Sequence, residues 1–198
     1  SWALLLDRRA SDIVPAAEAA TWTALCSAPA APLAGLRPTG IDRVADRRLS
    51  VRRLTGAARL LSAQPRADLL AGLAQALQVV GQREPVFVTL EGHGREAVIP
   101  DVEANEAVGW YTTCFPVCLA PSSDPAHALT TLTAWFAQLA HGGIGYGLAA
   151  GQGRVPTYRP QIVLNYLGRM FAGDDDEGFA VLQESAQPGA LPGLLPPG

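Results

Sequence analysis

The stretch VFVTLEGHGRE, residues 86–96, decides the fold of this chain. Its first five residues form a β-branched apolar run, and a run of that length suits a strand buried in a sheet. Three chemically active side chains follow the strand directly, the carboxylate, imidazole and guanidinium of Glu91, His93 and Arg95. The two glycines between them permit backbone conformations that other residues avoid. The segment therefore predicts a buried strand that ends in a candidate site.

A purely structural interpretation of this turn stays open when the turn is considered alone. In that interpretation Glu91 and Arg95 form an ion pair at the end of the sheet, and His93 is an ordinary loop histidine. Both interpretations use the same residues, so other segments of the chain have to decide between them.

Patterns typical of helices and of strands alternate outward from this segment. Apolar residues recur at helical spacing in three segments, 11–28, 66–80 and 125–141. Composition or alternation predicts further strands in the segments 48–54, 108–119 and 162–167. Within the second of these, Pro116 favours an edge or a bulge of the sheet. The predicted class is therefore α/β, with a mixed sheet flanked by helices.

Size and charge narrow the class of protein further. A chain of 198 residues with 48% hydrophobic content can bury one core, so residues 1–186 are predicted to form one lobe. Residues 187–198, rich in proline and glycine, are predicted to be a tail or linker. The formal charge of −3 argues against nucleic acid as a partner. No apolar stretch approaches the roughly 20 residues that span a bilayer, and no signal peptide is evident, so a cytoplasmic protein without membrane contact is expected.

The chain contains three cysteines, Cys26, Cys114 and Cys118. An odd number without a CxxC pair supports neither a disulfide framework nor a zinc site. We therefore expect three buried thiols and no bound metal.

Four motifs resemble those of one family in order and spacing. LEGHGRE at residues 90–96 matches the EGHGRE signature of non-ribosomal peptide synthetase epimerization domains, and VGWYTTCFPV at 108–117 resembles their VGWFT stretch. GIGYG at 143–147 and NYLG at 165–168 resemble two further motifs. A fifth, less specific match is DLLAGLAQ at 68–75, which resembles a helix with the pattern DxLLxA. The chain thus resembles the C-terminal lobe of an epimerization domain, within the condensation-domain superfamily.

The resemblance implies a lobe of the chloramphenicol acetyltransferase type. Two such lobes form a V, whose tunnel admits the phosphopantetheine arm of a peptidyl carrier protein. The implied reaction converts the α-carbon of an aminoacyl or peptidyl thioester from L to D. It needs a base, an acid and stabilisation of an enolate, with no cofactor bound directly.

The motifs also imply roles for individual residues. Glu91 is the predicted base, because a partly buried carboxylate can take a proton that the thioester acidifies. Asn165 and Tyr166 are predicted to line the same tunnel and to hold or protonate the enolate. The structural alternative for Tyr166 is simple packing, as for many strand tyrosines.

Residues around the base have supporting roles in this interpretation. His93 and Arg95 are expected to orient the turn and pair charge, with His93 as an alternative proton partner. Trp110 and Tyr111 are expected to shape the wall between the lobes. The glycines of GGIGYG are expected to follow a helix instead of preceding one, which argues against nucleotide binding.

Departures from the family pattern leave three functions open. The paired-histidine motif HHxxxDG does not occur in this sequence, and Arg169 stands where the family usually has glutamine. The chain is expected to give half of an epimerase site, completed by an N-terminal lobe from the same parent chain or another. The alternatives are a condensation-type, amide-forming domain and a non-catalytic lobe that binds a carrier protein or serves as a scaffold.

Overall fold

The computed structural model of the chain describes residues 2–35, 49–52, 61–100, 102, 104–158 and 160–168. The helices and strands in these residues are α1 (Trp2–Ile13), α2 (Ala16–Cys26), α3 (Pro65–Val79), β1 (Val86–Gly92), η3 (Ala104–Glu106), β2 (Thr113–Leu119), α4 (Pro125–Gln138), η4 (Ala140–Gly143), α5 (Ile144–Gly151) and β3 (Ile162–Leu164). All of them belong to one compact unit of residues 1–42 and 61–166. Residues 43–60 and 167–198 form a second unit, of which only 49–52 and 167–168 are described.

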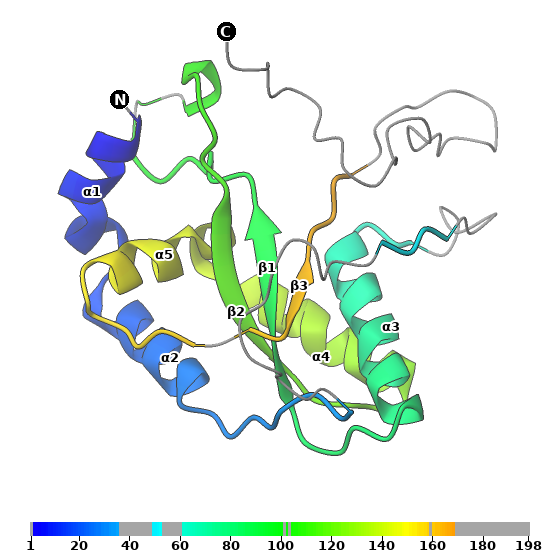
Figure 1. The fold of residues 1–198 in the computed structure, drawn as a ribbon. Coiled ribbons are helices and arrows are strands. Elements are labelled where there is room, and N and C mark those ends of the chain that lie inside the picture. The colour runs from blue at the N-terminus through cyan, green and yellow to red at the C-terminus, as the bar shows by residue number, and fades with distance from the viewer. Residues whose placement is uncertain are drawn as a thin grey trace, which may run out of the picture. The chain divides into compact units, whose positions relative to one another are not determined.

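The three strands form one mixed sheet in the order β2-β1-β3 (Figure 1). The central strand β1 runs antiparallel to β2 and parallel to β3. In this register Leu90 lies opposite Phe115 on one side and Leu164 on the other. The predicted class, α/β with a mixed sheet flanked by helices, is therefore confirmed.

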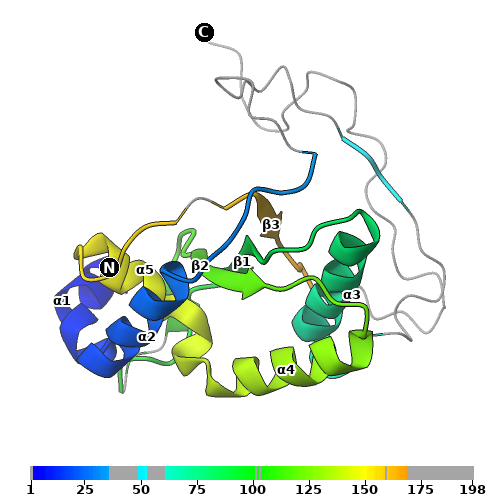
Figure 2. The same cartoon turned by 90° about the horizontal axis from the view of Figure 1, so that it is seen from below.

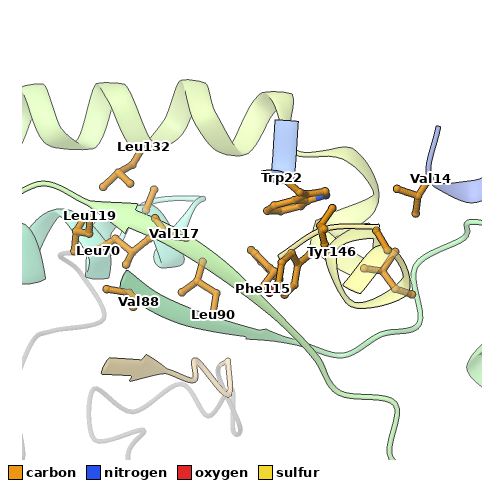
Figure 3. Close-up of a cluster of buried hydrophobic side chains, with 14 of the residues drawn as sticks. Val14, Trp22, Leu70, Val88, Leu90, Phe115, Val117, Leu119, Leu132 and Tyr146 are labelled. Carbon is orange, nitrogen blue, oxygen red and sulfur yellow. The ribbon is translucent and has the colours of Figure 1, made fainter. Parts of the chain in front are cut away.

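One face of the sheet packs against the helices. The side chains on this face alternate along β1 and β2 and are almost fully buried: Val86, Val88, Leu90, Phe115, Val117 and Leu119. Figure 3 shows several of them with Leu70 of α3, Trp22 of α2 and Leu132 of α4. Seen from below, α4 runs beside the sheet (Figure 2). The opposite face carries the alternate residues of β1, which include Glu91.

The strand predicted for residues 108–119 is shorter than expected. It begins at Thr113, and Val108 and Trp110 are each 97% exposed. The residues before Thr113 lie in a loop, in which the Gly109 carbonyl accepts a hydrogen bond from the Arg95 guanidinium. Pro116 of β2 lies opposite Thr89 of β1. Strand β2 is an edge strand of the described sheet, as predicted for a strand that contains a residue without an N–H.

The helix predicted for residues 11–28 is in fact two helices, α1 and α2. Pro15 separates them in an extended conformation, with φ −64° and ψ 163°. Proline lacks the N–H that a continuous helix needs and disfavours helical geometry in the residue before it. The first helix begins earlier than predicted, and its Trp2 is buried.

The remaining elements agree with the predictions to different extents. The helix predicted for 66–80 is confirmed by α3. The helix predicted for 125–141 ends at Gln138 in α4, because Leu139 takes an extended conformation with ψ 110°. Strand β3 ends at Leu164, three residues early. Residues 49–52 form no strand, with Leu49 and Val51 largely exposed, and the rest of the 48–54 prediction lies outside the described residues.

The predicted tail, residues 187–198, and Arg169 also lie outside the described residues. Within the described part of the chain, no helix is both long and apolar enough to cross a bilayer.

Candidate functional site

Glu91 lies near the end of β1, on the face of the sheet opposite the helical core. It is half-buried and lies opposite Cys114 of β2. The parallel pairing of β1 with β3 ends at Leu90 and Leu164, so Asn165 occupies the position beside Glu91 one step further on. Among the described residues, no hydrogen bond or ion pair involves the Glu91 carboxylate.

Asn165 and Tyr166 follow β3 at the same end of the sheet. Asn165 is exposed and Tyr166 is half-exposed. The carboxyl ends of the parallel strands β1 and β3 thus bring Glu91 and Asn165 to one edge, although they are far apart in the sequence. Their predicted roles toward a substrate stay predictions.

Cys114 shares the face with Glu91 and corrects the expectation of buried thiols. Cys114 is exposed, whereas Cys26 and Cys118 are half-buried. The alternation of side chains along β2 explains the error, because it directs Phe115 and Val117 into the core and both cysteines of the strand away from it. Desolvation raises the pKa of the Cys114 thiol, and the negative charge of Glu91 raises it further.

The turn after β1 is held in a conformation that only glycine adopts readily. Gly94 has φ +66°, and a Cβ at this position would collide with the carbonyl group of Tyr111. The Gly94 carbonyl accepts a buried hydrogen bond of 2.9 Å from Nε1 of Trp2. The first residues of α1 thereby fix the turn that follows Glu91.

One ring nitrogen of His93 forms a hydrogen bond within its own loop. Its Nδ1 accepts a 3.0 Å hydrogen bond from the backbone N–H of Arg95, so the neutral ring carries its proton on Nε2. Nε2 faces Oε1 of Glu96 at 3.6 Å. This geometry supports the expected role of orienting the turn better than the alternative role of proton partner.

Glu96, the last residue of the EGHGRE motif, was not singled out from the sequence. Its side chain is only 16% exposed. Its Oε2 and the Thr113 hydroxyl are buried without a hydrogen-bond partner among the described residues. The sequence shows that the motif ends in an acidic residue, but it does not show that this residue is buried. Glu96 is buried because the turn packs against Gly142, next to which the carboxylate lies.

Arg95 holds the loop between the turn and β2. Its guanidinium donates hydrogen bonds to the carbonyls of Ala104, Ala107 and Gly109 at 2.6, 2.7 and 2.9 Å. It also lies over the ring of Tyr111, 4.9 Å from the centroid. The alternative ion pair between Glu91 and Arg95 is therefore absent from the described structure. Arg95 instead orders the loop that presents Trp110 to solvent.

The GIGYG motif is part of the core, and one expectation about it is wrong. The segment opens a helix as well as following one, because α5 begins at Ile144. Gly143 has φ +91° and packs on Phe115, while the space beside Gly145 is filled by Glu18, so no phosphate cradle is present. Tyr146 is buried against Trp22, and desolvation raises its pKa to about 12.

A hydroxyl pair lies on the same face as Glu91, two residues earlier along β1. The side-chain oxygens of Thr89 and Tyr158 are 2.7 Å apart. The Tyr158 ring also packs on Phe87, with centroids 5.5 Å apart. Sequence reasoning missed this pair because its members are 69 residues apart and no local pattern relates them.

Among the described residues, no group of three or more histidine, cysteine, aspartate or glutamate side chains lies close enough to hold a metal ion. At the end of β1, the Glu91 carboxylate is a group that can take up and release a proton, and the amide and hydroxyl groups around it can form hydrogen bonds.

Comparisons with known proteins agree with the motifs. No protein-family model matches the chain. The chain is 34% identical over 108 residues to a mycosubtilin synthase chain of Bacillus subtilis, covering 51% of this chain and 4% of that protein. It is 32% identical over 105 residues to N-(5-amino-5-carboxypentanoyl)-L-cysteinyl-D-valine synthase of Penicillium rubens, covering 52% of this chain and 3% of that protein. It is 31% identical over 124 residues to bacitracin synthase 2 of Bacillus licheniformis, covering 60% of this chain and 5% of that protein. The chain thus spans only a small part of each of these synthases.

A comparison with solved structures identifies a domain with the same fold. The crystal structure of the epimerization domain from the third module of tyrocidine synthetase B superposes with a TM-score of 0.64 at 25% identity. The match covers 87% of this chain and 43% of that domain. The resemblance inferred from the four motifs is thereby confirmed, and the chain spans less than half of the domain that it resembles.

Proposed function

We propose that this chain, which resembles the C-terminal lobe of a non-ribosomal peptide synthetase epimerization domain, supplies half of an epimerase site with Glu91 as its base. The observation that carries the proposal is the position of Glu91. It lies at the end of the central strand, half-buried, on the face of the sheet that the helical core leaves free. The substrate is an aminoacyl or peptidyl thioester.

The chemistry follows from the group that Glu91 offers. The carboxylate takes the α-proton, and the electron pair of the C–H bond enters the enolate, whose charge rests on the former carbonyl oxygen. An acid on the opposite side returns a proton to the other face of the α-carbon. That acid is to come from the N-terminal lobe with the motif HHxxxDG, whereas Nδ1 of His93 already accepts a hydrogen bond within its own loop.

The partners follow from the same proposal. The thioester is carried on the phosphopantetheine of a peptidyl carrier protein, and no other cofactor is needed for proton transfer. The need for a second lobe is supported by the extent of the structural match, which covers 43% of the solved epimerization domain. Asn165 and Tyr166, at the same end of the sheet, are to line the path of the substrate.

The experiment that tests the proposal is α-proton exchange in deuterated buffer, measured by mass spectrometry on a carrier-bound aminoacyl thioester. The chain is assayed alone and together with an HHxxxDG lobe, each as the unsubstituted protein and as Glu91→Gln. Glu84→Gln is the matched control, because Glu84 is exposed at the other end of β1.

We expect exchange with the added lobe, its loss in Glu91→Gln and its retention in Glu84→Gln. Exchange that persists in Glu91→Gln removes Glu91 from the role of base. Carrier binding without exchange in any combination would favour the non-catalytic docking lobe, and amide formation without exchange would favour the condensation-type domain.

A further inference from the structure

The hydroxyl pair of Thr89 and Tyr158 is held rigidly on the face that carries Glu91. Thr89 is 5% exposed and its Oγ1 lies 2.7 Å from the Tyr158 hydroxyl. The Tyr158 ring is fixed between Phe87 and Tyr146, at centroid distances of 5.5 and 5.7 Å. Two hydroxyls in contact use one proton between them, which leaves the other proton for a further acceptor.

The pair lies close to Glu91. Thr89 and Glu91 are two residues apart on one face of β1, so their side chains leave the strand about 7 Å apart. Cys114 lies opposite Glu91 on the neighbouring strand. The charge of Glu91 raises the pKa of Cys114, and the charge of the Cys114 thiolate raises the pKa of Tyr158. Glu91, Cys114 and the hydroxyl pair therefore lie on the same face of the sheet.

The spacing fits one small acyl group. A reacting α-carbon lies roughly 3 to 3.5 Å from the atom that takes its proton. Its carbonyl oxygen is about 2.4 Å away through two bonds, and a hydrogen bond to a hydroxyl adds about 2.7 Å. A thioester can therefore bridge the interval between Glu91 and the hydroxyl pair.

We propose that the Tyr158 hydroxyl donates a hydrogen bond to the carbonyl oxygen of the thioester bound at Glu91, with Thr89 donating in turn to Tyr158. The inference rests on the proposed function and adds a catalytic residue to it. When Glu91 removes the α-proton, negative charge moves onto the oxygen that Tyr158 contacts, so the hydrogen bond is stronger in the enolate than in the substrate. Tyr158 keeps its proton throughout.

The surroundings of Tyr158 suit this role. Desolvation raises the pKa of its phenol, which therefore stays neutral and remains a donor at the pH of the reaction. The hydrogen bond with Thr89 acts in the opposite direction and lowers the pKa, as expected for a partner that supports charge on the phenol oxygen. The remaining contacts of the ring are aromatic and hold its position.

The test is steady-state α-proton exchange by the lobe-completed protein carrying Tyr158→Phe, with a carrier-bound aminoacyl thioester as the probe. We expect kcat to fall about 100-fold with KM changed less than about twofold, since loss of one oxyanion donor costs roughly 100- to 1,000-fold. Thr130→Val is the control. It removes an exposed hydroxyl that donates to the Ala126 carbonyl within α4, away from the face that carries Glu91.

A second pair of variants separates chemistry from folding. Thr89→Ser keeps the hydroxyl and should retain exchange, whereas Thr89→Val should lower kcat about tenfold. The double variant of Thr89→Val and Tyr158→Phe should be no slower than Tyr158→Phe alone, because Thr89 acts through Tyr158. Urea unfolding confirms that each variant is folded.

The inference is overturned if folded Tyr158→Phe exchanges as fast as the unsubstituted protein, or if only KM changes. Absence of exchange in the unsubstituted lobe-completed protein overturns the proposed function, and the role of Tyr158 falls with it. The two failures are distinguished by the activity of the unsubstituted protein.

Discussion

Replacing Gly94 by alanine tests whether the turn after β1 is fixed by a close backbone approach. Two glycines have almost the same left-handed backbone, Gly94 at φ +66° and Gly153 at φ +68°. At Gly153 a Cβ would meet nothing within 4 Å, whereas at Gly94 it would collide with the Tyr111 carbonyl and lie 3.2 Å from Cγ2 of Thr113. The two substitutions therefore share the conformational cost and differ in the collision.

The expected magnitudes follow from this difference. A left-handed alanine costs roughly 1 to 2 kcal/mol, which is the whole expected loss for Gly153→Ala. Crowding of a packed site adds about 1 to 3 kcal/mol, so Gly94→Ala should lose roughly 2 to 5 kcal/mol. The collision with Tyr111 should also displace the carbonyl of residue 94 itself, which accepts the hydrogen bond from Trp2.

The assay is equilibrium unfolding of the full chain in urea, followed by far-ultraviolet circular dichroism and by tryptophan fluorescence. Gly94→Ala should unfold at a clearly lower urea concentration than Gly153→Ala, with similar m-values. Equal losses in the two variants would refute the reasoning, because the turn would then accommodate a side chain by a cheap rearrangement.

Three further predictions concern the site and its supports. Glu91→Gln removes a charge that raises the pKa of Cys114, so this pKa should fall and iodoacetamide should alkylate the thiol faster at pH 8. The alkylation rate is measured by peptide mapping. Cys118 is the internal control whose rate should not change, because its pKa is raised by burial alone. Arg95→Ala removes three hydrogen bonds to loop carbonyls, so limited proteolysis should cleave the loop around Trp110 faster, and an unchanged rate would show that the loop is ordered by other contacts. Asp124→Ala removes the side chain that accepts from the N–H groups of Ala126 and His127, and should cost about 1 kcal/mol in urea unfolding; Asp124→Asn should cost clearly less, and equal losses would argue against the helix cap.

Several elements could be predicted because their signals are local. The β-branched run of β1, the apolar spacing of α3 and the Asp124–Pro125 start of α4 are each contained in a few consecutive residues. The turn chemistry of EGHGRE is local too. The sequence predicted a buried strand at residues 86–90 with Glu91 directly after it, and β1 continues through Glu91 to Gly92. The class of fold and the resemblance to epimerization domains rest on these segments.

Other features depended on contacts between distant segments. Arg95 binds the carbonyls of Ala104, Ala107 and Gly109 in the loop before β2, and Trp2 binds Gly94 across 92 residues. Tyr158 reaches Thr89 across 69 residues. No pattern in neighbouring residues encodes such a contact, because the partner is chosen by how the sheet and helices pack.

The sequence by itself thus determined the strand and the turn, since local propensity and side-chain alternation depend on consecutive residues. The role of Glu91 as base is what the resemblance of the motifs implies. Only the tertiary structure decided what surrounds the base. It showed that Arg95 binds backbone instead of Glu91, that Cys114 is exposed opposite Glu91, and that a hydroxyl pair lies on the same face. The physical reason is that a side chain takes its partners from the surface on which packing places it.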